Sequence, residues 1–322
     1  MKRIMFSLMA LVMCMSINAQ VIEIYDKENA LVGSYNCDEA AMVKLIESPF
    51  YLKYVNLGLP SGLKWATCNV YALDNEPTAT GDYYAWGETF RYNNSAGDFS
   101  DNTENWKNGK ENGYSWNTYS RKEKTDQEPN GDFIEWTTAP WEAYAISTYT
   151  YYKLKSEFDV ASVEDNWKKG NNWRIPTKED WEELYDNCYW VWTDNYRGET
   201  SAKGFIVYHA EWINNGGGRQ IDRNPELYTL DKPHIFLPAG GRIEGKALDD
   251  DYAKDAACYW SSTLQVGDVD NPHPQAYATK ISQSDITVET EPGKNTSTMQ
   301  ATNRYLGLSI RPVCPNLAHG AE

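Results

Sequence analysis

Residues 173–185 read WRIPTKEDWEELY and decide the helical half of the fold. Thr177 stands at an N-cap position, and Asp180, three residues later, completes a capping-box pattern that places acidic side chains in the positively polarised first turn. One apolar face then recurs at helical spacing: Trp181, Leu184 and Tyr185. The stretch predicts a helix that begins after Thr177 and packs on a core.

The sequence on the C-terminal side of this helix has the pattern of strands. Short runs rich in β-branched and aromatic residues alternate there with turn residues. We expect strands at 190–192, 205–208, 235–237, 259–262, 277–281, 286–288 and 306–313. A second helix is expected over 158–169, with Asp159 as its N-cap. Strands that follow two main helices predict an α+β fold with short antiparallel strands and long loops.

Two segments are predicted to be long loops. Residues 91–152 are rich in Asn, Gly, Ser, Trp and Tyr without a clean period, and 211–233 is an insert too long for a hairpin turn. Excess loop on a rigid sheet is where binding residues concentrate. The insert is therefore a candidate binding surface.

The first part of the chain differs from the rest. Residues 1–19 combine a basic start, an apolar run and a small residue before a cut, which predicts a signal peptide and export to the periplasm, the cell surface or the medium. No stretch reaches the roughly 20 apolar residues of a transmembrane helix. Residues 20–53 predict a β-hairpin and helix extension. The main domain is expected over 54–314, followed by a tail at 315–322.

The charge restricts the partners. The chain has 30 basic and 46 acidic residues and a net charge of −16, and such a field repels the phosphates of nucleic acids. Nucleic-acid binding is thus excluded. The 13 Trp and 23 Tyr greatly outnumber the 8 Phe, so the chain prefers rings with a polar edge, which suit glycan and protein contacts as well as half-buried sheet surfaces.

Several ordered motifs together resemble one family. They are YVNLGLPSG (54–62), KWATCNV (64–70), GDYYAWGE (81–88), WRIPT (173–177), IFLPAGG (235–241), YWSS (259–262) and SIRPV (309–313). In this order they look like the Fibrobacter succinogenes major paralogous domain family. The resemblance covers about residues 54–314 and implies a C-type-lectin-like fold, distantly related to formylglycine-generating enzymes, in exported proteins of Gram-negative gut bacteria. It implies no established reaction.

The sequence does not determine which cysteines form disulfides. Removal of Cys14 with the signal leaves an odd number: Cys37, Cys68, Cys188, Cys258 and Cys314. The lectin-like habit of joining the terminal strands, which the resemblance implies, would pair Cys68 with Cys314. Other pairings remain open.

Four aromatic residues are candidates for a ligand face. Trp212 and Tyr228 lie in the polar insert, where they have little reason to be buried. Trp190 and Trp192 alternate on a predicted strand, so both indoles point to one side of the sheet. They either stack on a sugar or fill the core beside Trp181, and the core interpretation is favoured.

An acidic cluster is a candidate calcium site. Asp249, Asp250, Asp251 and Asp255 lie in one predicted loop, and hard cations take several carboxylate oxygens. The spacing is not that of an EF-hand, and a solvated acidic face is the favoured alternative. No other cofactor is expected.

Three functions are compatible with these features. The leading hypothesis is a secreted or surface-exposed, non-enzymatic binding or adhesion module for an extracellular glycan or protein. The alternatives are an extracellular hydrolytic or carbohydrate-active enzyme that uses carboxylates and a structural subunit of a surface fibre. Two motifs also have a catalytic or ligand-binding interpretation, namely Ser261 as a nucleophile and Arg174 in a pocket. The favoured interpretation is structural: Arg174 pairs with a carboxylate or a carbonyl while Pro176 and Thr177 start the helix, and the serine hydroxyl bonds to a backbone group.

Overall fold

The computed structural model divides the chain into two compact units, Met1–Ser48 and Pro49–Glu322. It describes residues 21–25, 31–36, 54–72, 75–89, 113–121, 134–140, 148–163, 172–214, 216, 218–249, 255–265, 275–282 and 299–315. In the first unit, strands β1 (Val21–Tyr25) and β2 (Leu31–Asn36) form an antiparallel hairpin, which confirms that part of the prediction. The expected signal segment and the helix after the hairpin lie outside the described residues.

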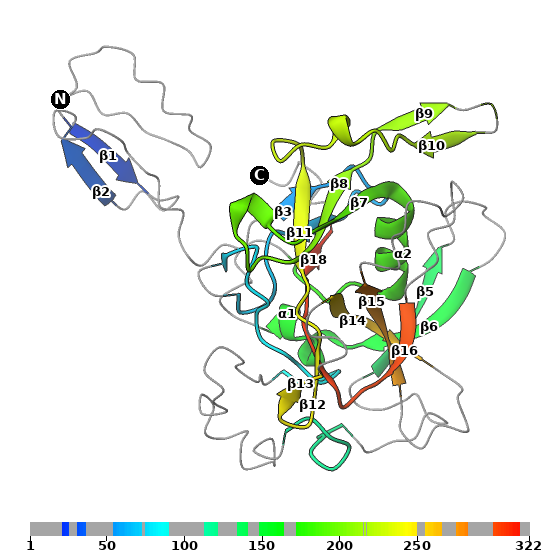
Figure 1. The fold of residues 1–322 in the computed structure, drawn as a ribbon. Helices are drawn as coiled ribbons and strands as arrows, with labels where there is room; N and C mark the ends of the chain where they lie inside the picture. The colour runs from blue at the N-terminus through cyan, green and yellow to red at the C-terminus, as the bar shows by residue number, and fades with distance from the viewer. Residues whose placement is uncertain are drawn as a thin grey trace. The chain divides into compact units, whose positions relative to one another are not determined.

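The largest sheet of the second unit has five antiparallel strands in the order β16-β15-β14-β6-β5 (Figure 1). Its strands are β5 (Ile134–Pro140), β6 (Thr148–Leu154), β14 (Ala256–Leu264), β15 (Gln275–Ser282) and β16 (Met299–Asn303). The prediction that 91–152 consists of loops is therefore wrong for β5 and β6. Alternating Thr and Tyr favour a strand, and the register of Thr263 with Lys153 fixes β6 against β14.

Smaller antiparallel sheets surround this one. Strands β3 (Tyr54–Asn56), β4 (Lys64–Ala66) and β18 (Val313–Cys314) form one. Strands β12 (Arg242–Glu244), β13 (Ala247–Leu248) and β17 (Gly307–Leu308) form another. The expected strand at 306–313 is thus split between two sheets, and the one at 286–288 lies outside the described residues. The α+β class with short antiparallel strands is confirmed in this coarse form.

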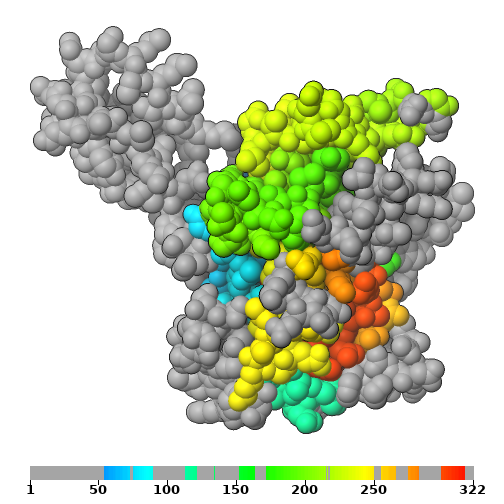
Figure 2. Space-filling model, in the orientation of Figure 1, coloured from blue at the N-terminus to red at the C-terminus, as the bar shows by residue number. Residues whose placement is uncertain are grey.

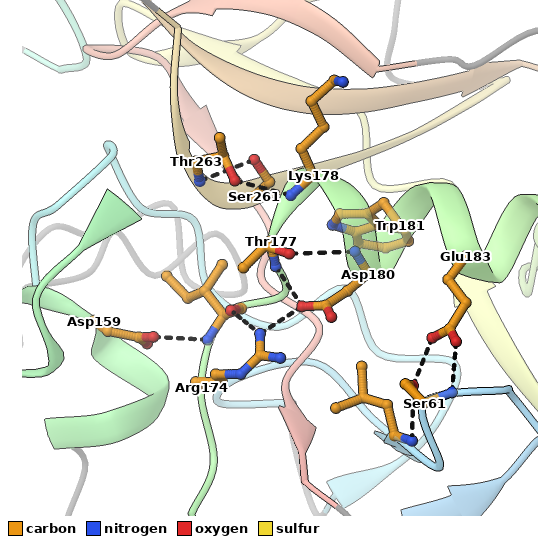
Figure 3. Close-up of polar contacts among 12 residues, drawn as sticks. Ser61, Asp159, Arg174, Thr177, Lys178, Asp180, Trp181, Glu183, Ser261 and Thr263 are labelled. Carbon is orange, nitrogen blue, oxygen red and sulfur yellow. Dashed lines mark hydrogen bonds and ion pairs between the residues drawn. The ribbon is translucent and has the colours of Figure 1, made fainter. Parts of the chain in front are cut away.

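Helix α2 (Lys178–Asn187) begins where the sequence predicts. The Thr177 hydroxyl accepts a hydrogen bond from the Asp180 amide at 3.2 Å, and the Asp180 carboxylate accepts one from the Thr177 amide at 2.7 Å (Figure 3). The hydroxyl of Thr263 in β14 accepts from the Lys178 amide at 2.9 Å. The amides of the first turn are therefore capped both by the Thr177–Asp180 capping box and by a side chain of the largest sheet.

The apolar face of α2 is buried as predicted. Trp181, Leu184 and Tyr185 are at most 3% exposed, and the Trp181 ring meets that of Trp65 edge-on with centroids 4.7 Å apart. Within the described part of the chain, no helix has the length and apolar character needed to span a membrane.

The predicted earlier helix is described only as α1 (Val160–Val163). Asp159 caps it, since one carboxylate oxygen accepts from the Ala161 amide at 2.9 Å. The other oxygen accepts from the Ile175 amide at 2.8 Å, the bond drawn from Asp159 in Figure 3. Burial raises the pKa of Asp159 to about 6, while these amide bonds oppose the rise.

Arg311 joins the two ends of the second unit. It is fully buried, and its guanidinium donates to the Asn69 side-chain oxygen and to the carbonyls of Ala66 and Phe236 at 2.7–2.9 Å. Nearby, β18 pairs with β4. Strand β4 and the last described strand, β18, are thus held together by a ladder, and the Arg311 side chain adds a bond to the Ala66 carbonyl at the end of β4.

The proposed disulfide between Cys68 and Cys314 is not formed. Both are buried free thiols, as are Cys188 and Cys258, and Cys37 lies outside the described residues. Cys314 stands opposite Lys64 in the ladder, and Cys68 lies four positions farther along the chain, beyond the end of β4 at Ala66. The ladder therefore does not place the two cysteines opposite each other.

Candidate ligand-binding surface

A three-stranded sheet supports the insert. It is made of β7 (Cys188–Thr193), β8 (Gly204–His209) and β11 (His234–Pro238) in the order β11-β8-β7. Side chains alternate between its two faces. The inner face belongs to the core cluster that also holds α2: Trp190, Trp192, Phe205, Val207, Ile235 and Leu237. The outer face carries Tyr189, Val191, Ile206, Tyr208, His234 and Phe236.

Both candidate tryptophans of β7 lie on the inner face. Trp190 is 6% exposed, and its indole N–H donates to the Leu184 carbonyl at 3.3 Å. Trp192 is partly buried, with its ring 5.0 Å from that of Phe205. The prediction that the two indoles share a face is confirmed. The core interpretation fits both, because they pack on core residues.

The outer face carries a row of aromatic side chains. Tyr189, Tyr208 and His234 stand opposite one another in register. Tyr196, from the loop after β7, stacks on Phe236 with centroids 4.2 Å apart, and its hydroxyl lies 2.9 Å from Nε2 of His234. Burial lowers the pKa of His234, so the imidazole is neutral near pH 7. This row forms a second, smaller core.

Tyr228 closes this second core, and the expectation that it is exposed is wrong. Its ring stacks on Tyr189 with centroids 4.0 Å apart, and the side chain is 8% exposed. Its hydroxyl accepts from the Glu211 amide at 3.2 Å and donates to the Asp222 carbonyl. Burial raises the pKa of Tyr228 to about 12. Sequence reasoning missed this role because Tyr189, the stacking partner, lies on a distant strand.

The insert folds into a hairpin. Strands β9 (Trp212–Asn214) and β10 (Arg219–Ile221) pair only with each other among the described strands, as Figure 1 shows. A backbone bond from the Asp222 amide to the Glu211 carbonyl at 2.7 Å closes its base. These are the two residues that Tyr228 binds. The hairpin is thus fixed to the three-stranded sheet at its base, while its strands extend along the surface (yellow-green in Figure 2).

One face of the hairpin combines an aromatic ring, a cation and an amide. This face carries Trp212, Asn214 and Arg219. Arg219 stands opposite Asn214, and Trp212 lies two residues before Asn214 on the same strand, so its side chain points to the same side. The guanidinium carbon of Arg219 is 4.1 Å from the Trp212 ring centroid. Ile213, on the other face, is 42% exposed. Of the two candidates in the insert, Trp212 alone remains available to a ligand.

Sequence reasoning singled out Trp212 but missed Arg219 and Ile213. The signal was present, since Asn215-Gly216 between short apolar-containing runs is the strongest local pattern for a tight hairpin. That pattern predicts a hairpin at this position but not its register: a two-residue Asn-Gly turn would pair Asn214 with Gly217, whereas Asn214 stands opposite Arg219.

The acidic cluster is only partly described. Asp249 forms an ion pair with Arg242, with its carboxylate 2.9 Å from Nε and 2.7 Å from a terminal guanidinium nitrogen. Asp255 is exposed, and Asp250 and Asp251 lie outside the described residues. No group of three or more potential metal ligands occurs in the described part of the chain.

The motif residues with a catalytic or ligand-binding alternative have structural partners. Arg174 pairs with Asp180 at 2.5 Å and donates to the Ile175 carbonyl at 3.1 Å (Figure 3). The Ser261 hydroxyl donates to the Tyr277 carbonyl at 2.7 Å. Nδ1 of His209 lies 2.6 Å from the Leu57 carbonyl. The contacts of Arg174 and Ser261 support the structural interpretation of both motifs.

Comparison of the chain with protein-family models, with curated proteins and with solved structures found no match. The family resemblance and the lectin-like fold therefore stay predictions, and function is inferred from the geometry alone.

Proposed function

We propose that this protein is an exported or surface-exposed binding module, without catalytic activity, that holds a glycan against the Trp212 face of the β9–β10 hairpin. The observation that carries the proposal is the Trp212–Arg219 stack on a hairpin whose base is fixed by Tyr228. A fixed base matters because a surface that is ordered before binding loses less entropy when the ligand arrives.

The chemistry of this face suits a sugar. The apolar C–H side of a pyranose packs on an aromatic ring, and its hydroxyls need planar donors and acceptors at the rim. Trp212 is half-buried, so the body of the indole is held in place while part of it meets solvent. Asn214 and Arg219 are exposed on the same face and can bond to hydroxyls on either side of the ring.

The described nucleophile candidates favour binding over catalysis. Burial raises the pKa of Cys68 and of Cys314 to about 11, so neither thiol is a nucleophile near neutral pH. His234 binds a tyrosine and a backbone carbonyl, and His209 meets a carbonyl. In the described part of the chain neither histidine hydrogen-bonds a serine or a cysteine, as the base that activates such a nucleophile does.

A glycan array tests the proposal. Wild-type protein should bind a subset of glycans, and Trp212→Ala should remove the binding while the melting temperature stays within about 2 °C of wild type. Tyr54→Ala is the matched control: Tyr54 is 44% exposed on another sheet, and Lys64 lies 4.5 Å above its ring. That variant should bind like wild type.

The same array should be run with calcium and with a chelator. If Trp212→Ala binds the same glycans as the wild type, the proposed site is wrong. Absence of glycan binding under both conditions would overturn the glycan proposal itself.

A further inference from the structure

We infer that the ligand of the β9–β10 hairpin carries a carboxylate, as a uronic acid residue does, and that Arg219 binds this group. The inference rests on the proposed function and specifies its ligand class. Its starting point is the charge on the hairpin, because Arg219 is the only charged side chain from Trp212 to Ile221.

Arg219 is an exposed arginine without a carboxylate partner among the described residues, although acidic residues outnumber basic ones by 46 to 30. Arg174, in contrast, pairs with Asp180, and Arg242 with Asp249. Arg197 and Arg223 share the property of Arg219, but of the three only Arg219 lies over a tryptophan that meets solvent. A cation that the chain leaves unneutralised can bind an external anion.

The stack on Trp212 prepares this guanidinium for a planar anion. The guanidinium carbon lies 4.1 Å from the indole centroid, a distance that suits a parallel stack, and such a stack leaves the N–H donors along the edge of the group for a ligand. Two parallel N–H donors match the two oxygens of a carboxylate. Ring contact also limits the rotamers of the long side chain, so less entropy is lost when the carboxylate binds.

A uronic acid satisfies both parts of the site. Its carboxylate lies at the edge of the pyranose, so the edge reaches Arg219 while the ring packs on the Trp212–Arg219 stack. Asn214, opposite Arg219 in the register, supplies an amide for a neighbouring hydroxyl. A densely sulfated chain fits less well, because it presents many charges to one cation on a protein whose net charge is −16.

Direct binding measurements separate these ligand classes. The probes are an oligogalacturonate, its methyl-esterified form, which is uncharged, and a sulfated galactan oligosaccharide of equal length. Titration calorimetry should show the oligogalacturonate binding at least about tenfold more tightly than the ester, as expected for a charge-assisted hydrogen bond. Arg219→Gln should remove this difference, and Arg219→Lys should restore only part of it because an ammonium cannot form the bidentate pair.

Lys203→Gln provides the matched control for charge. It removes one positive charge from an exposed side chain on another loop, so it changes the net charge by the same amount and should leave the preference intact. All variants alter exposed residues, and circular dichroism with a thermal melt confirms that they fold.

Three outcomes would overturn the inference. Equal affinity for acid and ester, unchanged in Arg219→Gln, would leave the glycan-binding proposal in place but remove the carboxylate. Tighter binding of the sulfated probe would assign a different anion. If other glycans bind through Trp212 and none of these three probes does, the inference fails while the proposed function stands.

Discussion

Tyr228→Phe is the change that best isolates the anchor of the β9–β10 hairpin. The substitution keeps the ring that stacks on Tyr189 at 4.0 Å. It removes the hydroxyl that accepts from the Glu211 amide and donates to the Asp222 carbonyl. The expected effect is therefore confined to the base of the hairpin, because the second core keeps its packing.

The magnitude follows from the number of bonds lost. Each hydrogen bond contributes about 0.5–1.5 kcal/mol net, and the direct bond between Asp222 and Glu211 at 2.7 Å remains. We expect the free energy of local opening to fall by about 1–2 kcal/mol, which is a factor of about 5–30 in the open population.

Hydrogen–deuterium exchange with mass spectrometry measures this population. Peptides that span residues 209–223 should exchange about 5–30 times faster in Tyr228→Phe, while peptides from β14 should exchange as in wild type. Tyr208→Phe is the control, since Tyr208 lies 5.6 Å from Tyr228 in the same cluster but its hydroxyl has no hydrogen bond among the described residues. Unchanged exchange in the hairpin, or an equal increase in both variants, would refute the anchoring role.

Four further predictions test the frame that supports this surface. The Asp159 carboxyl has a pKa that rises from 3.8 to about 6 on folding, so its contribution to stability should depend on pH. The free energy of unfolding of the wild type, minus that of Asp159→Asn, should fall as pH increases from about 4 to about 6. A difference that increases over this range would mean that the amide bonds outweigh burial. Thr177→Ala should cost about 1–2 kcal/mol in urea unfolding because it removes the N-cap of α2, and a loss below about 0.3 kcal/mol would contradict this. Cys68 and Cys314 should react with a thiol reagent at pH 8 only after unfolding, since both are buried; rapid labelling of the native protein would argue against the packing described. Millimolar calcium should leave the melting temperature unchanged because Arg242 already neutralises Asp249, whereas an increase with calcium concentration would show a site.

Local features of this fold are readable from sequence. The capping box of Thr177 and Asp180 involves residues three apart, so it depends on no distant partner. The shared face of Trp190 and Trp192 follows from the period of a strand alone. Both predictions are confirmed for that reason.

The missed features depend on partners far along the chain. Tyr228 is buried because Tyr189, on β7 and 39 residues earlier in the chain, supplies a ring to stack on. Cys314 meets Lys64 rather than Cys68 because of a ladder register that no local pattern encodes. Burial in a polar insert and register between terminal strands both come from tertiary packing, which overrides local preference.

The position of Arg311 has a consequence for the order in which the protein can fold. Its donors hold the Ala66 carbonyl across a separation of 245 residues and the Asn69 side chain across 242. Until the last part of the chain has been synthesised, these early oxygens lack their donor, and β4 lacks the β18 strand that pairs with it. Such distant contacts slow folding, because a long loop must close before any stabilising contact forms. The amino-terminal half of this unit should thus remain unfinished until synthesis reaches residues 311–314.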